Sequence, residues 1–80
     1  MPRFHFDIHE GSRLIADEDG QNLANLGVAR KEAMLTGASI AREAFLVGST
    51  DHVVVDVRED EHATCLKISI TLEVEELADG

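Results

Sequence analysis

Apolar and polar residues alternate through the last third of the chain. The apolar positions fall on every second residue from Leu66 to Val74, with mostly polar residues between them. Successive side chains of a strand point to opposite faces of a sheet, so this segment presents one apolar face and one hydrophilic face. The pattern predicts a strand over residues 63–75, in a sheet that is covered on one side and exposed to water on the other.

The first residues of the chain show the same alternation. Phe4, Phe6 and Ile8 alternate with polar residues and predict a strand over residues 3–9. A glycine-containing turn then leads to a short strand over residues 13–16, which pairs back as a hairpin. The pattern leaves open which residues of the second strand face inward, because a shift of one residue inverts its faces.

A valine-rich segment follows later in the chain. Val53, Val55 and Val57 alternate with other residues and predict a strand over residues 52–58. The charged residues 59–62 then form the hairpin loop to the last strand.

Between these strand pairs the period changes to that of a helix, over residues 26–47. Asn25 is the expected N-cap, and Gly48 is the expected residue after the C-cap. Gly37 lies within the core-facing stripe, where it indicates a close approach of helix and sheet. That stripe consists mostly of alanine and glycine: Leu26, Ala29, Ala33, Gly37, Ile40, Ala44 and Val47.

The order of elements predicts an α+β fold. We expect a two-layer β-β-α-β-β sandwich, in which a four-stranded, mainly antiparallel sheet carries one helix on its apolar face. The 80 residues form one small domain, with an ordered core over about residues 3–75. A core of this size supplies only about 3–5 kcal/mol of net stability, and self-association is a common way to add to it.

Charge and composition narrow the function. The formal net charge of −9 argues against direct binding to nucleic acid or to an anionic membrane. The single cysteine excludes an intrachain disulfide, and no apolar run approaches the roughly 20 residues of a membrane span. We therefore expect a cytoplasmic protein without cofactors.

His5, Asp7 and His9 are the most suggestive polar residues, because alternation places all three on one face of the first strand. Two imidazoles and a carboxylate can bind zinc or iron, although side chains two residues apart on a strand diverge. We expect an ordinary polar sheet face, with these residues as weak metal candidates. Cys65 would need one of the two histidines beside it to act as a nucleophile.

The side of the helix opposite its core stripe also carries apolar residues. Val28, Leu35 and Leu46 lie about 180° from the stripe, where a helix on a sheet normally faces water. They predict an interface, such as helix-against-helix dimerisation.

Several motifs resemble a family of short bacterial proteins of unknown function. These are the opening Met1-Pro2-Arg3-Phe4, the glycine turn, and the helical segment Ala29-Arg30-Lys31-Glu32-Ala33. Because these positions form turns, caps and a helix stripe, the resemblance implies no catalytic residue. The chain is also similar, more weakly, to HicB-type antitoxins, which implies binding to a small basic toxin.

Together these observations predict a small interaction or regulatory module without catalytic activity. Its expected partner is a second copy of the chain or another protein. An antitoxin that binds a basic toxin, and a metal-binding protein that uses the polar sheet face, are the alternatives.

Overall fold

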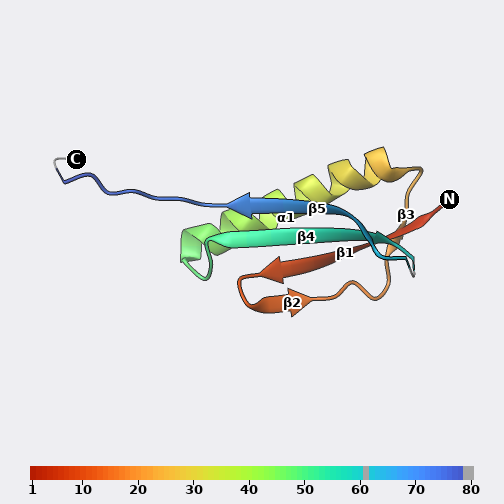
Figure 1. Ribbon diagram of the computed structural model, residues 1–80, viewed down its shortest axis with the longest axis horizontal. Helices are drawn as coiled ribbons and strands as arrows, with labels where there is room; N and C mark the ends of the chain where they lie inside the picture. Colours follow the sequence, from red (N-terminus) through yellow and green to blue (C-terminus); the bar gives the residue numbers. More distant parts are fainter. Residues whose placement is uncertain (61, 79–80) are drawn as a thin grey trace.

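The computed structural model describes residues 1–60 and 62–78, and within them one helix packs against one face of a five-stranded sheet (Figure 1). The helix α1 spans Leu26–Val47, as the sequence predicts. The strands are β1 (Arg3–Glu10), β2 (Arg13–Ile15), β3 (Gln21–Asn22), β4 (His52–Glu59) and β5 (Thr64–Thr71). The predicted α+β sandwich is confirmed.

The sheet has the order β2-β1-β4-β5, and all neighbours are antiparallel. Within it, β1 and β4 form the central pair, in which Phe6 lies opposite Val57. The hairpin between β1 and β2 pairs Ile8 with Ile15, which settles the register that the sequence left open. The short β3 pairs with the opposite end of β1, so β2 and β3 share the same edge.

The core lies between α1 and the two central strands. It contains the phenylalanines and Ile8 of β1, three valines of β4 and three alanines of α1: Phe4, Phe6, Ile8, Ala29, Ala33, Ala41, Val53, Val55 and Val57. A Cβ atom added at Gly37 would lie 3.0 Å from Val55 Cγ2 and 3.1 Å from Ile70 Cδ1. Glycine therefore allows the helix to lie close to the sheet, as its place in the stripe predicts.

Both predicted caps of α1 are present. The Asn25 side chain accepts a hydrogen bond from the Val28 amide at 3.0 Å. Gly48 has φ 77°, a left-handed conformation that glycine adopts without a steric cost, and its amide donates to the Ala44 carbonyl. The two ends of the predicted stripe are less covered than expected, since Leu26 and Val47 are exposed.

The last strand is shorter than the predicted 63–75. The strand β5 ends at Thr71, which lies opposite His52 at the start of β4. The Leu72 amide still donates to the Asp51 carbonyl just before β4, and the chain then continues away from the body (Figure 1). The alternation of Leu72 and Val74 continues the strand pattern into a segment that has lost its neighbouring strand.

The short β3 was not predicted. It has only two residues, both polar, and so carries no alternation to detect. It forms because it pairs with Arg3 and Phe4 on the outer edge of β1. The predicted strand 13–16 ends one residue early, at Ile15. Of the predicted loop 59–62, residue 61 lies outside the described residues.

Candidate functional site

The polar face of the sheet is partly covered, which corrects the expectation that it is fully open to water. Residues 16–20 connect β2 to β3 and pass beside β1. His5 is only 7% exposed, and its Nδ1 donates to the Asp17 carbonyl at 2.9 Å. The segment 16–20 therefore shields the His5 side chain from water at this end of β1.

Asp17 organises this covering segment. Its Oδ2 accepts a hydrogen bond from the Phe6 amide at 3.1 Å, and its Oδ1 accepts one from the Gly20 amide at 3.0 Å. Burial raises the pKa of Asp17, but the amides of Gly20, Phe6 and Asp19 and the nearby His5 together lower it below its ordinary value. The ionised carboxylate is thus a structural group that joins this segment to β1.

Asp7 and Arg58 form an ion pair across β1 and β4. Arg58 Nε donates to Asp7 Oδ2 at 2.8 Å, and Arg58 Nη2 donates to the Asp17 carbonyl at 3.1 Å. Asp7 Oδ1 also accepts a hydrogen bond from the Asp17 amide at 2.9 Å. Burial raises the pKa of Asp7, but these hydrogen bonds and the positive charge of Arg58 lower it overall.

The proposed metal candidates each contact a different partner. His5 binds the Asp17 carbonyl and Asp7 pairs with Arg58, whereas His9 Nε2 donates to Asp56 Oδ2 at 2.9 Å. Within residues 1–60 and 62–78, no group of three His, Cys, Asp or Glu side chains has the arrangement that could hold a metal ion.

Beside His9 the polar face has a hollow of about 280 Å³ that His52, Val54, Asp56 and Lys67 also line. Asp56 Oδ1 is buried there without a hydrogen-bond partner among the described residues. The lining of this hollow thus includes a carboxylate, a lysine and two histidines.

Cys65 does not lie beside a histidine of β1, because β4 separates β5 from β1. The pairing of Val57 with Leu66 and of Arg58 with Thr64 leaves Cys65 as the extra residue of a bulge. Its thiol lies 3.3 Å from the Val57 carbonyl oxygen and donates to it. The geometry that would activate this thiol through His5 or His9 is thus missing.

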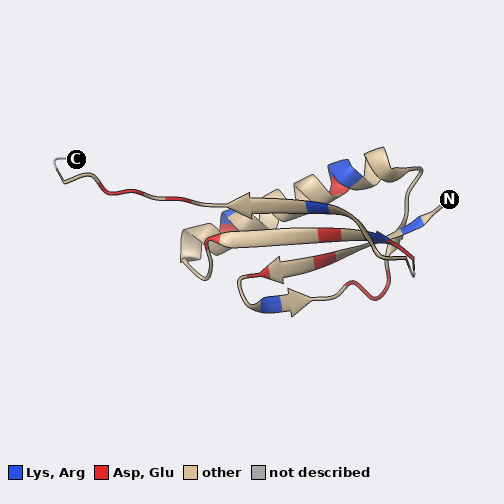
Figure 2. Cartoon of the chain, in the orientation of Figure 1, with Lys and Arg blue, Asp and Glu red and all other residues tan. Residues whose placement is uncertain are grey.

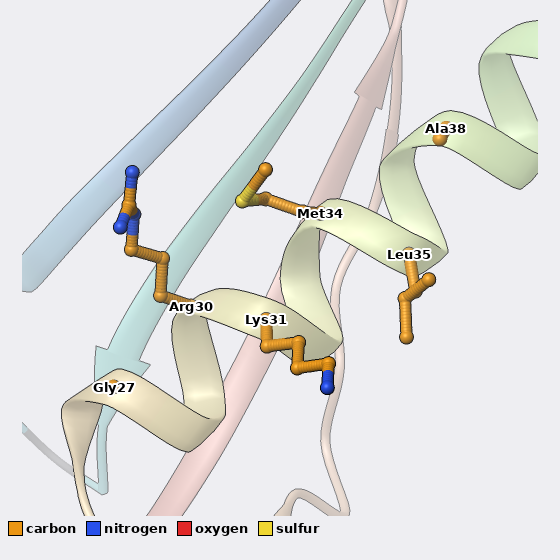
Figure 3. Close-up of a pocket in the computed structure, with 6 residues that line it drawn as sticks. All are labelled: Gly27, Arg30, Lys31, Met34, Leu35 and Ala38. Carbon is orange, nitrogen blue, oxygen red and sulfur yellow. The ribbon is translucent and has the colours of Figure 1, made fainter.

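The side of α1 that faces away from the sheet is exposed, and it carries apolar residues among charged ones. Val28, Leu35 and Leu46, the interface residues proposed from the sequence, are 39%, 58% and 77% exposed. A shallow, open hollow of about 480 Å³ lies along the first half of this side (Figure 3). We call the three residues and the lining of this hollow the outer surface of α1; the lining residues are Gly27, Arg30, Lys31, Met34, Leu35 and Ala38.

Two cations frame this hollow. In Figure 3, Arg30 and Met34 project to one side of the helix, whereas Lys31 and Leu35 project to the other. Three of the 7 Lys and Arg residues of the chain lie on α1, although the chain has 16 acidic residues (Figure 2). Among the described residues, Arg30 and Lys31 form no ion pair. The outer surface of α1 therefore combines apolar groups with unpaired positive charge.

Sequence comparison places the chain in a family. Residues 3–71, which include all five strands and α1, match the domain of unknown function DUF6894. The chain belongs to this family. No curated protein and no solved structure matches it. The resemblance to an uncharacterised family is thus confirmed, while the similarity to HicB-type antitoxins stays a prediction.

The sequence did not reveal the roles of Asp17 and Arg58. The segment Asp17-Glu18-Asp19-Gly20 is a turn, as its composition indicates, and the Gly20 amide bonds back to Asp17. Its contacts with β1 and β4 depend on residues that are far away in the sequence. An acidic residue followed three positions later by a glycine was the available signal, and it identified the turn alone. The described part of the chain contains no helix that is long and apolar enough to cross a membrane.

Proposed function

We propose that this chain is a protein-interaction module without catalytic activity, and that it self-associates through the outer surface of α1. The exposed apolar side of α1 carries the proposal. Leu35 and Leu46 are more than half exposed on it, and the hollow beside Leu35 has walls of Met34 and Ala38. A small domain normally turns polar residues to water on this side of a helix, and a sizeable apolar area there marks a contact surface.

The polar face of the sheet supports a structural role for its charged residues. Asp7, Asp17 and Arg58 are bonded to one another, and His9 is bonded to Asp56. Groups that already satisfy one another in this way hold the covering segment and the strands together. The free thiol of Cys65 suits a reducing compartment, which agrees with a place in the cytoplasm.

Self-association fits the size of the core. The core lies between α1 and the strands β1 and β4, and its largest fully buried side chains are only three valines of β4. Small domains with so little buried volume commonly gain stability from a second chain. Contact between two α1 helices would remove apolar side chains of both copies from water.

The test is the mass in solution of the wild type and of Leu35→Glu, measured by light scattering over a dilution series. We expect the wild type to exceed the 8.7 kDa of one chain and Leu35→Glu to form a smaller species. Leu14→Glu is the matched control, because Leu14 on β2 is 57% exposed and Leu35 is 58% exposed. An unchanged mass for Leu35→Glu would show that the outer surface of α1 is not a self-association contact.

A further inference from the structure

The outer edge of β5 has no neighbouring strand among the described residues. The Leu72 amide donates to the Asp51 carbonyl at 2.9 Å, on the side of β4. In an antiparallel pair, residues alternate between those that bond to the neighbour and those that point away. The backbone N–H and C=O groups of Lys67, Ser69 and Thr71 therefore point away from β4, in the plane of the sheet and toward its free edge.

The chain beyond β5 continues as an extended segment that lies free of the body (Figure 1). Leu72 is 39% exposed and Val74 is 75% exposed, yet both continue the alternation of β5. Acidic residues occupy the positions between and after them, at Glu73, Glu75 and Glu76 (Figure 2). The segment has the pattern of a strand and lacks a partner strand.

The apolar side of β5 is also incompletely covered. Leu66, Ile68 and Ile70 pack against the core but are only partly buried, whereas Val53, Val55 and Val57 on the adjacent β4 are fully buried. An exposed edge strand with a half-covered apolar face readily accepts another strand.

We propose that β5 of a second copy pairs antiparallel with this edge, about a two-fold axis at Ile70. Ile70 then lies opposite its own copy. A residue that precedes position 70 by a given number of residues lies opposite the partner residue that follows position 70 by the same number. The apolar pairs are Leu66 with Val74 and Ile68 with Leu72, which are the residues that one chain alone leaves partly exposed.

Charge complementarity and apolar complementarity together select this register. On the polar side, Lys67 lies opposite Glu73, and Ser69 lies opposite Thr71. Opposite charges placed directly across a strand pair are stabilising. An axis at Ser69 would instead place Lys67 opposite Thr71. An axis at Thr71 would place Lys67 opposite Glu75, but it would also place the apolar Leu66 opposite Glu76. A shift of one residue would set apolar side chains against polar ones.

This contact is separate from the outer surface of α1. A two-fold axis perpendicular to the sheet leaves both helices on the same face of one continuous sheet. Val28, Leu35 and Leu46 point away from that sheet and stay accessible in both copies. The edge pairing can therefore form whether or not the α1 contact does, and both together allow an assembly larger than a dimer.

The experiment is a charge exchange, measured by light scattering on the full chain over a dilution series. Lys67→Glu and Glu73→Lys each place like charges opposite one another at two symmetric positions. We expect each to weaken the edge contact by about tenfold or more. The double variant K67E/E73K restores both pairs and should restore the wild-type affinity. The variant K67E/E75K should not restore it.

Arg13→Glu is the matched control, because it reverses a charge on the exposed β2 and should leave the mass unchanged. We expect each variant to fold, because Lys67 and Glu73 both lie outside the core. Circular dichroism of each variant verifies this. Retention of wild-type affinity by Lys67→Glu, or failure of the double exchange to restore it, would overturn the edge proposal.

The variant Leu35→Glu separates the two proposals. When both contacts exist, Leu35→Glu retains the edge dimer of twice 8.7 kDa, and K67E/L35E is a monomer. When only the edge contact exists, Leu35→Glu has the wild-type mass and Lys67→Glu lowers it. When only the α1 contact exists, the effects are reversed and the edge proposal fails.

Discussion

The two edges of the sheet end differently. At the outer edge of β1, β2 pairs with residues 8–10, the Asp17 carboxylate accepts from the Phe6 amide, and β3 pairs with residues 3–4. We call this the closed edge. The outer edge of β5, the open edge, has no such cover among residues 1–60 and 62–78. Residues 13–22 of the same chain cover the closed edge, and we infer that a second copy covers the open edge.

This difference agrees with how proteins handle edge strands. A bare row of amides and carbonyls is a template for pairing, so it is normally shortened, charged or covered. The closed edge is covered by two short strands and a carboxylate. The open edge carries a single lysine and an acidic extension, which together suit pairing with a copy of itself.

The largest expected effect on stability comes from a core residue of β1, the strand at the closed edge. Phe6 is buried between β1 and α1, so Phe6→Ala should lower the free energy of unfolding by about 3–5 kcal/mol. Val74→Ala removes an exposed side chain and should change the stability of the dilute monomer by less than about 0.5 kcal/mol. Urea unfolding measures both. Equal effects would contradict the location of the core.

A smaller effect is expected at the carboxylate of the closed edge. Asp17→Ala removes the acceptors of the Phe6 and Gly20 amides and should cost about 1–3 kcal/mol in urea unfolding. Asp19→Ala is the matched control two residues away, since the exposed Asp19 side chain has no such contact. If Asp19→Ala cost as much as Asp17→Ala, the edge would not depend on this carboxylate.

The same carboxylates predict a dependence on pH. Folding lowers the pKa of Asp7 and Asp17, so the unfolded chain takes up protons more readily at acid pH. Their contribution to stability is present above the unfolded pKa of about 4 and is lost as the pH falls below it. Unfolding midpoints between pH 7 and pH 3 should fall less steeply for Asp17→Asn than for the wild type. Parallel curves would show that Asp17 does not contribute.

Much of the fold could be predicted from local patterns. The bounds of α1 and its caps at Asn25 and Gly48 are confirmed, because each depends on residues nearby in sequence. The close approach at Gly37 is confirmed as well, since helical periodicity places this residue in the stripe that faces the sheet. The predicted end of the last strand at residue 75 was wrong, because the length of β5 depends on the extent of the neighbouring β4. Alternation describes the strand that a segment can form, and pairing decides how much of it forms in one chain.

The candidate site was less accessible to prediction. The exposure of Val28, Leu35 and Leu46 follows from helical periodicity and is confirmed. The network of Asp7, Asp17 and Arg58 joins three segments that are far apart in sequence, so no spacing could reveal it. The burial of His5 likewise depends on where the segment 16–20 crosses β1.

Hydrogen exchange at the two edges compares them most directly. The Phe6 amide, bonded to Asp17, should be protected at every protein concentration. The outward amides of Lys67, Ser69 and Thr71 should be protected in concentrated solution and exchange rapidly on dilution, as the pairing with a second copy dissociates. Rapid exchange of these three amides at all concentrations would contradict the account.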